Sequence, residues 1–219
     1  MAISEITTQR STGEANSSTV TLTYTNTPAQ NSLLVAAFWC RSRTVSSAPS
    51  GWSLANTSTS SGETVYMYYK IAGAGEGASH SWTMSGSGNY VIAGSEWTGI
   101  DTASPLDVVA ANNGTGTAGT TGTHGTLAQA NELIAVAYFN PNTSTWSAHD
   151  NSQTEIAEIT STNGLATTKN TVSLATRTVS STTGVNYGAT LSASRAWGTI
   201  LASFKEAAAT NTGSFFSFF

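Results

Sequence analysis

The sequence predicts an all-β fold, a jelly-roll-like antiparallel β-sandwich built from two sequence-related halves. Charged residues make up only 9% of the 219 residues, against roughly 25% in ordinary soluble domains. Ser, Thr, Gly and Asn supply most of the polar remainder, and these residues favour pleated surfaces and tight turns over helices. Segments of alternating apolar and polar residues recur along the chain, and the pattern of the first half returns in the second.

Alternation of period two predicts five strands in the first half. They cover residues 19–24, 33–40, 64–71, 79–84 and 90–97. The run Pro49-Ser50-Gly51-Trp52 is typical of a turn that delivers a tryptophan into the next strand, and the Gly-rich segment 73–77 is typical of a hairpin connection.

An internal repeat relates the two halves. Residues 29–38 return as residues 128–138, which places Asn31 over Asn131 at a period of about 100 residues. Residues 82–87 are echoed at 189–194, and 90–97 correspond to 197–204. Each half opens with a nearly continuous apolar strand, which indicates burial on both faces. We therefore expect a single domain over residues 1–206, with repeats at about 17–107 and 115–206 and one shared core, although two small separate sandwiches are the alternative.

The segment between the halves, residues 110–125, consists almost wholly of Gly, Thr, Ala and Asn. It has two interpretations. One is a flexible linker. The other is a Thr-rich edge strand over 115–123, because the equivalent first-half stretch alternates cleanly and polar edge strands resist unwanted pairing.

Residues 207–219 form a C-terminal tail that the repeat does not contain. Four of its last five residues are Phe. Full burial of one Phe side chain stabilises by about 1.5–3 kcal/mol, so four Phe side chains exposed to water are an aggregation hazard. We expect the tail to dock, either on a neighbouring subunit or partner, or back on its own sandwich. The predicted partner-docking residues are Phe215, Phe216, Phe218 and Phe219.

Composition argues against several classes of function. The formal net charge is −4, and eight Lys and Arg residues are scattered along the chain, which leaves no basic stripe for nucleic acid. Cys40 is the single cysteine, so it can form no disulfide within the chain and is expected to be a buried inert thiol. No apolar stretch approaches the roughly 18 residues that cross a bilayer. The N-terminal residues lack a secretory signal pattern, which favours synthesis in a cytoplasm without membrane insertion.

The search for catalytic motifs favours a protein without enzymatic activity or cofactor. Residues 114–119 match G-x-G-x-x-G but lack the flanking strand, helix and acidic residue of a dinucleotide site. No G-x-S-x-G motif is present. Glu155 and Glu158 have opposite strand parity, and Glu96 near Asp101 is expected to be an ordinary surface carboxylate. The histidines, expected on the solvent side, are His80, His124 and His149.

The tryptophans and the loop aspartates are candidates for a glycan-binding site and a calcium site. Aromatic faces stack on sugars in lectin-like sites, and most of the six tryptophans lie within apolar alternation. The surface candidates, and so the candidate glycan-binding residues, are Trp52, Trp82 and Trp146. Loop carboxylates at Asp101, Asp107 and Asp150 are candidate calcium ligands, but no D-x-D-x-D cluster exists, and no metal is expected.

Several of these segments together resemble β-rich virion proteins of tailed bacteriophages. They are Asn31-Ser32-Leu33-Leu34-Val35-Ala36, Ala48-Pro49-Ser50-Gly51-Trp52, residues 64–70, Ser81-Trp82-Thr83-Met84 and Glu96-Trp97-Thr98-Gly99-Ile100-Asp101. The resemblance extends to about residue 206 and implies no catalytic residues. The second half departs from it, because the Pro-Ser-Gly-Trp turn is reduced to Ser144-Thr145-Trp146.

The resemblance implies a virion structural protein, made in the host cytoplasm and exposed on the particle. Capsid decoration or cement on the head is the favoured role, with the major capsid or tail protein as partner. The alternative is a tail- or fibre-associated adhesin that binds host surface glycans. We expect a homo-oligomer, with a trimer as one candidate, and no nucleic acid partner.

Overall fold

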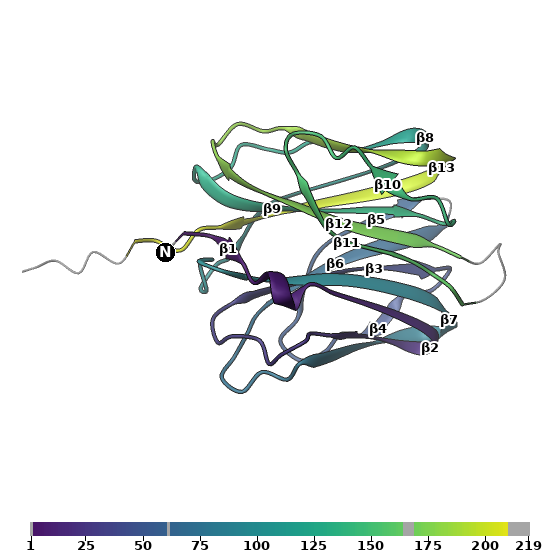
Figure 1. Ribbon diagram of the computed structural model, residues 1–219, viewed down its shortest axis with the longest axis horizontal. Coiled ribbons are helices and arrows are strands. Elements are labelled where there is room, and N and C mark those ends of the chain that lie inside the picture. The colour runs from purple at the N-terminus through teal and green to yellow at the C-terminus, as the bar shows by residue number, and fades with distance from the viewer. Residues whose placement is uncertain (1, 61, 164–168, 210–219) are drawn as a thin grey trace, which may run out of the picture.

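The computed structural model describes residues 2–60, 62–163 and 169–209. Two antiparallel sheets pack face to face, and the described residues are mostly strand, apart from turns and one 3-10 turn, η1 (Thr7–Gln9). Figure 1 shows the two layers one above the other. The predicted all-β antiparallel sandwich is confirmed.

The first sheet is formed by the N-terminal half. Its path runs β1-β7-β3-β6-β5, and β2 and β4 also pair with β7. The strands are β1 (Ser4–Glu5), β2 (Ser11–Thr23), β3 (Leu33–Arg41), β4 (Val45–Ser47), β5 (Ser53–Ser60), β6 (Glu63–Ile71) and β7 (Ser79–Thr98).

The second sheet is formed by the C-terminal half. Its path runs β10-β13-β9-β12-β11, and β8 pairs with β13. The strands are β8 (Leu106–Thr123), β9 (Asn131–Asn140), β10 (Trp146–Ser147), β11 (Thr154–Thr160), β12 (Thr171–Ser180) and β13 (Asn186–Lys205).

The two sheets share one strand order, with β2 to β7 matched in sequence by β8 to β13. The register agrees residue by residue, since Leu33 lies opposite Trp97 in the first sheet and Leu133 lies opposite Phe204 in the second. Residues 106–123 form one long strand. The linker interpretation of 110–125 is therefore wrong, and the edge-strand interpretation describes this segment.

A central apolar core lies between the sheets and draws on both halves. Alternate residues of β3 and of β9 enter it. Because the next residues along each strand enter a second apolar cluster on the outer face, β3 and β9 are buried on both sides, as their continuous apolar sequences predict. The β3 residues in the central core are Leu33, Val35, Ala37 and Trp39, and those of β9 are Leu133, Ala135, Ala137 and Phe139.

Long paired strands cover the outer face of each sheet. The segments predicted as two strands, 79–84 and 90–97, are one 20-residue strand, β7, which pairs with β2 along most of its length. Leu22 of β2 and Trp82 of β7 pack against Phe38 within the outer cluster. The same strand therefore contributes to the sheet at one end and to the cover of its outer face at the other.

Candidate functional site

The tryptophans expected at the surface are buried. Trp52 is 7% exposed, Trp82 is 0% exposed and Trp146 is 3% exposed. Trp52 and Trp82 pack edge to face with ring centroids 4.9 Å apart, and Trp146 packs against Tyr138. The expectation that these side chains are surface residues is wrong, because the curled long strands enclose them in the outer clusters. Their ring faces are not available to a sugar.

Glu96 is also buried rather than a surface carboxylate, with 1% exposure. One oxygen accepts hydrogen bonds from the Ser32 hydroxyl and the backbone N–H of Ala29, both at 2.6 Å. Glu96 thereby holds the loop that leads into β3. The expectation of an ordinary surface carboxylate is wrong, because the carboxylate is enclosed by this loop and hydrogen-bonded to it.

The second half contains the same pair with the two residue types exchanged. By strand register Glu132 of β9 occupies the position of Ser32, and Ser203 of β13 occupies the position of Glu96. Burial raises the pKa of Glu132 to about 7, the Ser203 hydroxyl opposes this rise, and the neighbouring Asp107 carboxyl adds to it. Each half thus buries one carboxyl group beneath the loop that precedes its central strand.

The histidines lie in the interior or against it. His80 and His124 are buried, and the His149 side chain is 6% exposed. The expectation of solvent-side positions is wrong for His80 and His124, because His80 packs against Trp52 and His124, just after β8, stacks on Tyr187. Burial lowers the pKa of His80 and of His149, so it favours their neutral forms.

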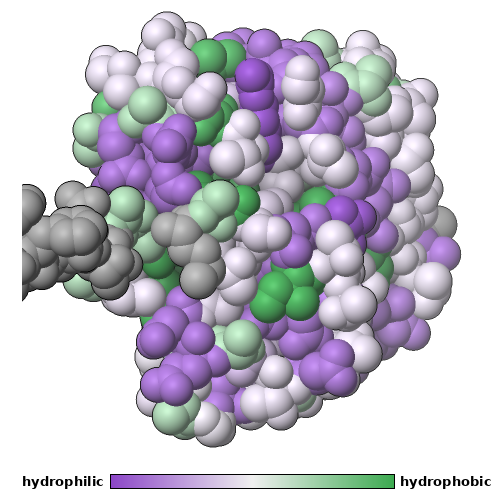
Figure 2. Space-filling view, turned by 60° about the vertical axis from the view of Figure 1, so that its left-hand side comes forward, coloured by the Kyte–Doolittle hydropathy of each residue, from purple (hydrophilic) through white to green (hydrophobic). Residues whose placement is uncertain are grey.

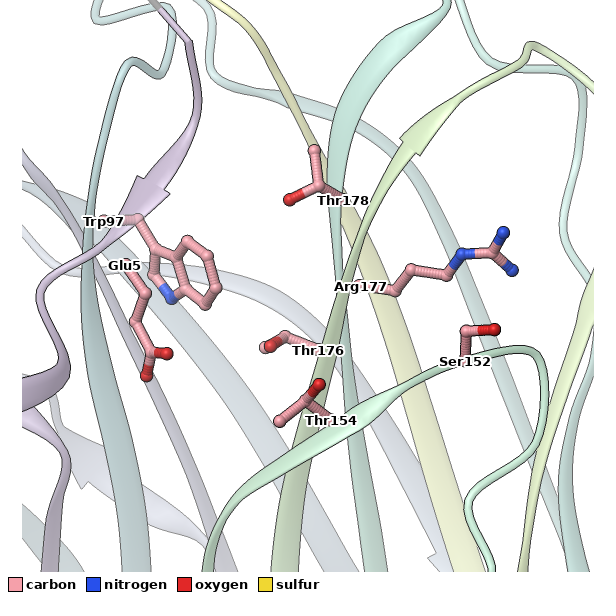
Figure 3. Close-up of a pocket in the computed structure, with 7 residues that line it drawn as sticks. All are labelled: Glu5, Trp97, Ser152, Thr154, Thr176, Arg177 and Thr178. Atoms are coloured by element: carbon pink, nitrogen blue, oxygen red, sulfur yellow. The ribbon is translucent and has the colours of Figure 1, made fainter.

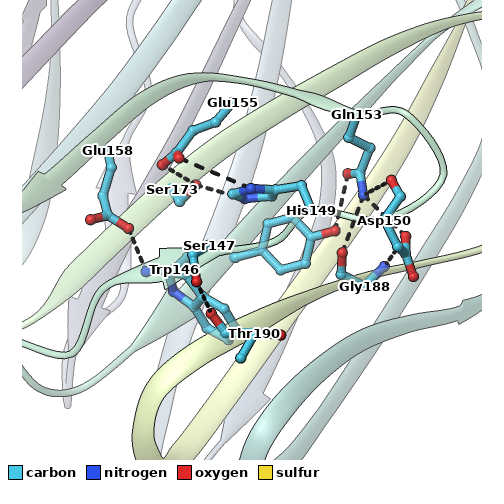
Figure 4. Close-up of polar contacts among 11 residues, drawn as sticks. Trp146, Ser147, His149, Asp150, Gln153, Glu155, Glu158, Ser173, Gly188 and Thr190 are labelled. Carbon is cyan, nitrogen blue, oxygen red and sulfur yellow. Dashed lines mark hydrogen bonds and ion pairs between the residues drawn. The ribbon is translucent and has the colours of Figure 1, made fainter.

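His149, Ser173 and Glu155 form a polar cluster on the outer face of the second sheet (Figure 4). The Ser173 hydroxyl donates to Glu155 Oε1 at 3.0 Å and lies 3.3 Å from His149 Nε2. Since the only hydroxyl proton points to Glu155, the imidazole acts as a donor to Ser173 and not as its base. Ser173 is fully buried. This geometry supports a structural cluster and not an activated nucleophile.

Glu158 lies at the other end of the same cluster (Figure 4). Its carboxylate accepts the backbone N–H of Trp146 at 2.7 Å. Burial raises the pKa of Glu158 to about 7, the hydrogen bond from Trp146 opposes the rise, and nearby Glu155 adds to it. The carboxylate fastens the short strand β10 to the sheet.

The three aspartates that are candidate calcium ligands accept hydrogen bonds from backbone N–H groups. Asp101 accepts from Ala103 and Ser104, Asp107 accepts from Ala128, and Asp150 accepts from Gly188. Within the described residues no group of three or more His, Cys, Asp or Glu side chains is placed to hold a metal ion.

A groove of about 290 Å³ opens at the seam between the two sheets (Figure 3). Arg177 is held by a 2.6 Å bond from its guanidinium to the carbonyl of Asn151, and Glu5 by a pair of 2.8 Å bonds from Arg10. Hydroxyl groups predominate between these charges. We call it the seam groove; its lining residues are Glu5, Trp97, Ser152, Thr154, Thr176, Arg177 and Thr178.

The first and last described parts of the chain meet at one end of the sandwich, which we call the terminal pole. Gly99 has a φ of +78°, and a Cβ added there would lie 2.7 Å from the carbonyl carbon of Ala2. On its other side the Gly99 carbonyl accepts the N–H of Ala207 at 2.8 Å. Figure 1 shows β1 and the chain leaving β13 at this same end. The predicted docking residues Phe215, Phe216, Phe218 and Phe219 lie outside the described residues.

These features define an antiparallel β-sandwich with two equivalent sheets, a polar seam groove and a terminal pole. No protein-family model matches the chain, and no match is found among curated proteins or among solved structures. Among the described residues no helix is long and apolar enough to span a membrane.

Proposed function

We propose that this protein is a structural component of a bacteriophage particle, a decoration or cement protein of the head surface that attaches through its terminal pole. The observation that supports this proposal is the meeting of Ala2 and Ala207 on either side of Gly99. Because both ends of the described chain lie at one pole, a single surface can carry the attachment while the opposite end of the sandwich faces outward.

The lateral surface suits dense packing of many copies. Uncharged hydroxyl pairs bridge neighbouring strands, among them Thr21 with Ser81 at 2.7 Å and Thr23 with Ser79 at 3.0 Å. Only 9% of the residues are charged. Copies placed side by side on a particle therefore bring few charged side chains against one another.

Incorporation into particles tests the proposal. Deletion of residues 215–219 should abolish recovery of the protein with purified particles, because these aromatic residues supply apolar area for docking. A variant with all four phenylalanines replaced by leucine keeps most of that area and should retain partial incorporation. Unchanged incorporation of the deletion variant would contradict the role of the tail, and absence of the protein from imaged particles would contradict the virion assignment.

The seam groove favours a second proposal, a glycan-binding module that attaches to the host surface. Hydroxyl groups of Thr154, Thr176 and Thr178 and the carboxylate of Glu5 lie around this groove with the indole of Trp97, whereas the Arg177 guanidinium points away from Trp97 (Figure 3). Such groups recognise the hydroxyls of a saccharide by hydrogen bonding. A glycan array should give a signal that is lost in Thr178→Val and kept in Thr117→Val on β8. A blank array would reject this function.

A further inference from the structure

Two hollows flank the C-terminal segment at the terminal pole. The larger, of about 390 Å³, lies on the side of the first half and includes Gln30, Thr98, Ile100, Thr102 and Ala207 in its lining. The smaller, of about 220 Å³, lies on the side of the second half and includes Gln129, Asn131 and residues 207–209. We call them the Ile100 groove and the Gln129 groove. The face turned forward in Figure 2 is largely polar, with smaller apolar patches between.

The chain is held in place as it passes between these grooves. The N–H of Glu206 donates to the Asn131 carbonyl at 3.1 Å, and the N–H of Ala207 donates to the Gly99 carbonyl at 2.8 Å. Ile100 and Glu206 also form an isolated antiparallel bridge. Ala207 therefore belongs to the lining of both grooves, and whatever follows it in the sequence starts within reach of both.

The sequence that follows has a spacer and then an aromatic cluster. Residues 210–214 read Thr-Asn-Thr-Gly-Ser, and four of the next five residues are Phe. Asn, Gly and Ser are the residues that reverse a chain in tight turns. Fully extended, the five spacer residues would span at most about 17 Å. A spacer of this length and composition is compatible with a return of the aromatic residues to Ala207.

We propose that residues 215–219 fold back on their own chain and fill the Ile100 and Gln129 grooves in the free subunit. A cavity of about 150 Å³ is enough for one benzene ring. By that measure the larger groove has room for two phenyl rings and the smaller for one. A short tether gives the tail an effective concentration in the millimolar range, which favours the subunit's own tail over that of a second copy in dilute solution. The inference goes beyond the proposed function, because it states what covers the tail before any partner is met.

Limited proteolysis of the full-length protein tests the inference. Chymotrypsin cleaves after Phe, and when opening and closing are fast its rate follows the fraction of time that a site is open. The groove variant is Thr102→Arg, which places a long charged side chain in the Ile100 groove, and Thr117→Arg on β8 is the matched control. We expect cleavage within residues 215–219, followed by mass spectrometry, to be about tenfold slower in the wild type and in Thr117→Arg than in Thr102→Arg, a factor equivalent to ~1.4 kcal/mol.

Concentration dependence identifies the occupant. The wild-type cleavage rate constant should stay the same over a hundredfold range of protein concentration, while light scattering records the mass at each concentration. Equal cleavage in all three proteins would overturn the inference, as would protection that rises with concentration together with a dimeric or larger mass. Thermal unfolding checks that Thr102→Arg is folded, and Thr102→Tyr, which fills the groove with its own ring, provides a second variant with the same expected result.

Discussion

Trp39 and Phe139 stack on each other across the central core, with ring centroids 5.3 Å apart and planes inclined by 25°. The two residues occupy equivalent positions in the repeat, since Leu33 of β3 is equivalent to Leu133 of β9 and each ring lies six residues further along its strand. Each half therefore presents the same position of its central strand to the other half, and this pair joins the two halves within the central core.

The shared core predicts that the two halves unfold together. Trp39→Ala and Phe139→Ala should each lower the free energy of unfolding by about 3–5 kcal/mol, and the double variant should reveal a coupling of about 0.5–1.5 kcal/mol. Urea denaturation followed by tryptophan fluorescence and circular dichroism measures this. Leu54→Ala on the exposed part of β5 is the control and should change stability by less than about 0.5 kcal/mol. Two separate transitions in the wild type would contradict a common core.

Gly99→Ala should destabilise the terminal pole. The positive φ alone costs an L-residue about 1–2 kcal/mol, and the added methyl group would also press on Ala2 and on the N atom of Ile3, 2.9 Å away. Gly75 has a similar φ of +69° with nothing within 4 Å of an added Cβ. Gly75→Ala therefore isolates the backbone cost, and thermal unfolding should show the larger loss for Gly99→Ala. Equal losses would mean that the chain ends do not pack on Gly99.

The raised pKa of Glu132 predicts a loss of stability as the pH rises from about 4.5 toward neutrality. Its pKa is raised to about 7 from an ordinary value of 4.5, so the folded state binds a proton that the unfolded state has released. The stabilising contribution is present below about pH 4.5 and disappears as the pH rises to about 7, a change of up to ~3 kcal/mol. In Glu132→Gln the side chain stays neutral, and the free energy of unfolding measured from pH 4.5 to 8 should vary less than in the wild type. An unchanged profile would contradict the assignment.

The lowered pKa of Glu14 predicts the opposite pH dependence, a loss of stability as the pH falls. Burial opposes its ionisation, but hydrogen bonds from Ser161, Thr162 and Asn163 outweigh burial and lower the pKa of Glu14. Stability from this carboxylate is present above the unfolded pKa and is lost as the pH falls through the lower folded pKa. Glu14→Gln should cost about 1 kcal/mol near pH 7, after allowance for solvent screening. Hydrogen exchange at residues 161–163 should accelerate in this variant, whereas Glu5→Gln should leave it unchanged.

Cys40 should be unreactive in the folded protein. It lies in the outer cluster of the first half, and burial raises the pKa of its thiol to about 12. Because the thiolate is the reacting form, an aromatic disulfide reagent should label the protein only as it unfolds. The labelling rate should follow the unfolded fraction across a urea titration, and rapid labelling without urea would contradict burial.

Local sequence patterns predicted much of the strand content and the duplicated order. Alternation and the continuous apolar runs at 33–40 and 133–139 are properties of neighbouring residues, and they identify strands and buried faces directly. The polar strand β5 was missed, because Ser53–Ser60 contains few apolar residues that could reveal a period. The same regularity could not show that 79–84 and 90–97 are one strand, since Gly86 and Gly88 between them are typical of turns.

Local sequence patterns could not predict which individual side chains are buried. Trp82 and His80 alternate with polar neighbours as surface residues do, and they are buried because β2 and β7 bend over the outer face of their own sheet. Glu96 is buried because the loop before β3 packs on its carboxylate. Solvent exposure depends on which distant segments pack above a residue. Leu22 and Trp82, for example, share one apolar cluster although about 60 residues separate them in the sequence. The chain thus encodes its strands, their faces and the repeat locally, whereas the enclosure of the aromatic residues and carboxyl groups follows from packing between strands far apart in the sequence.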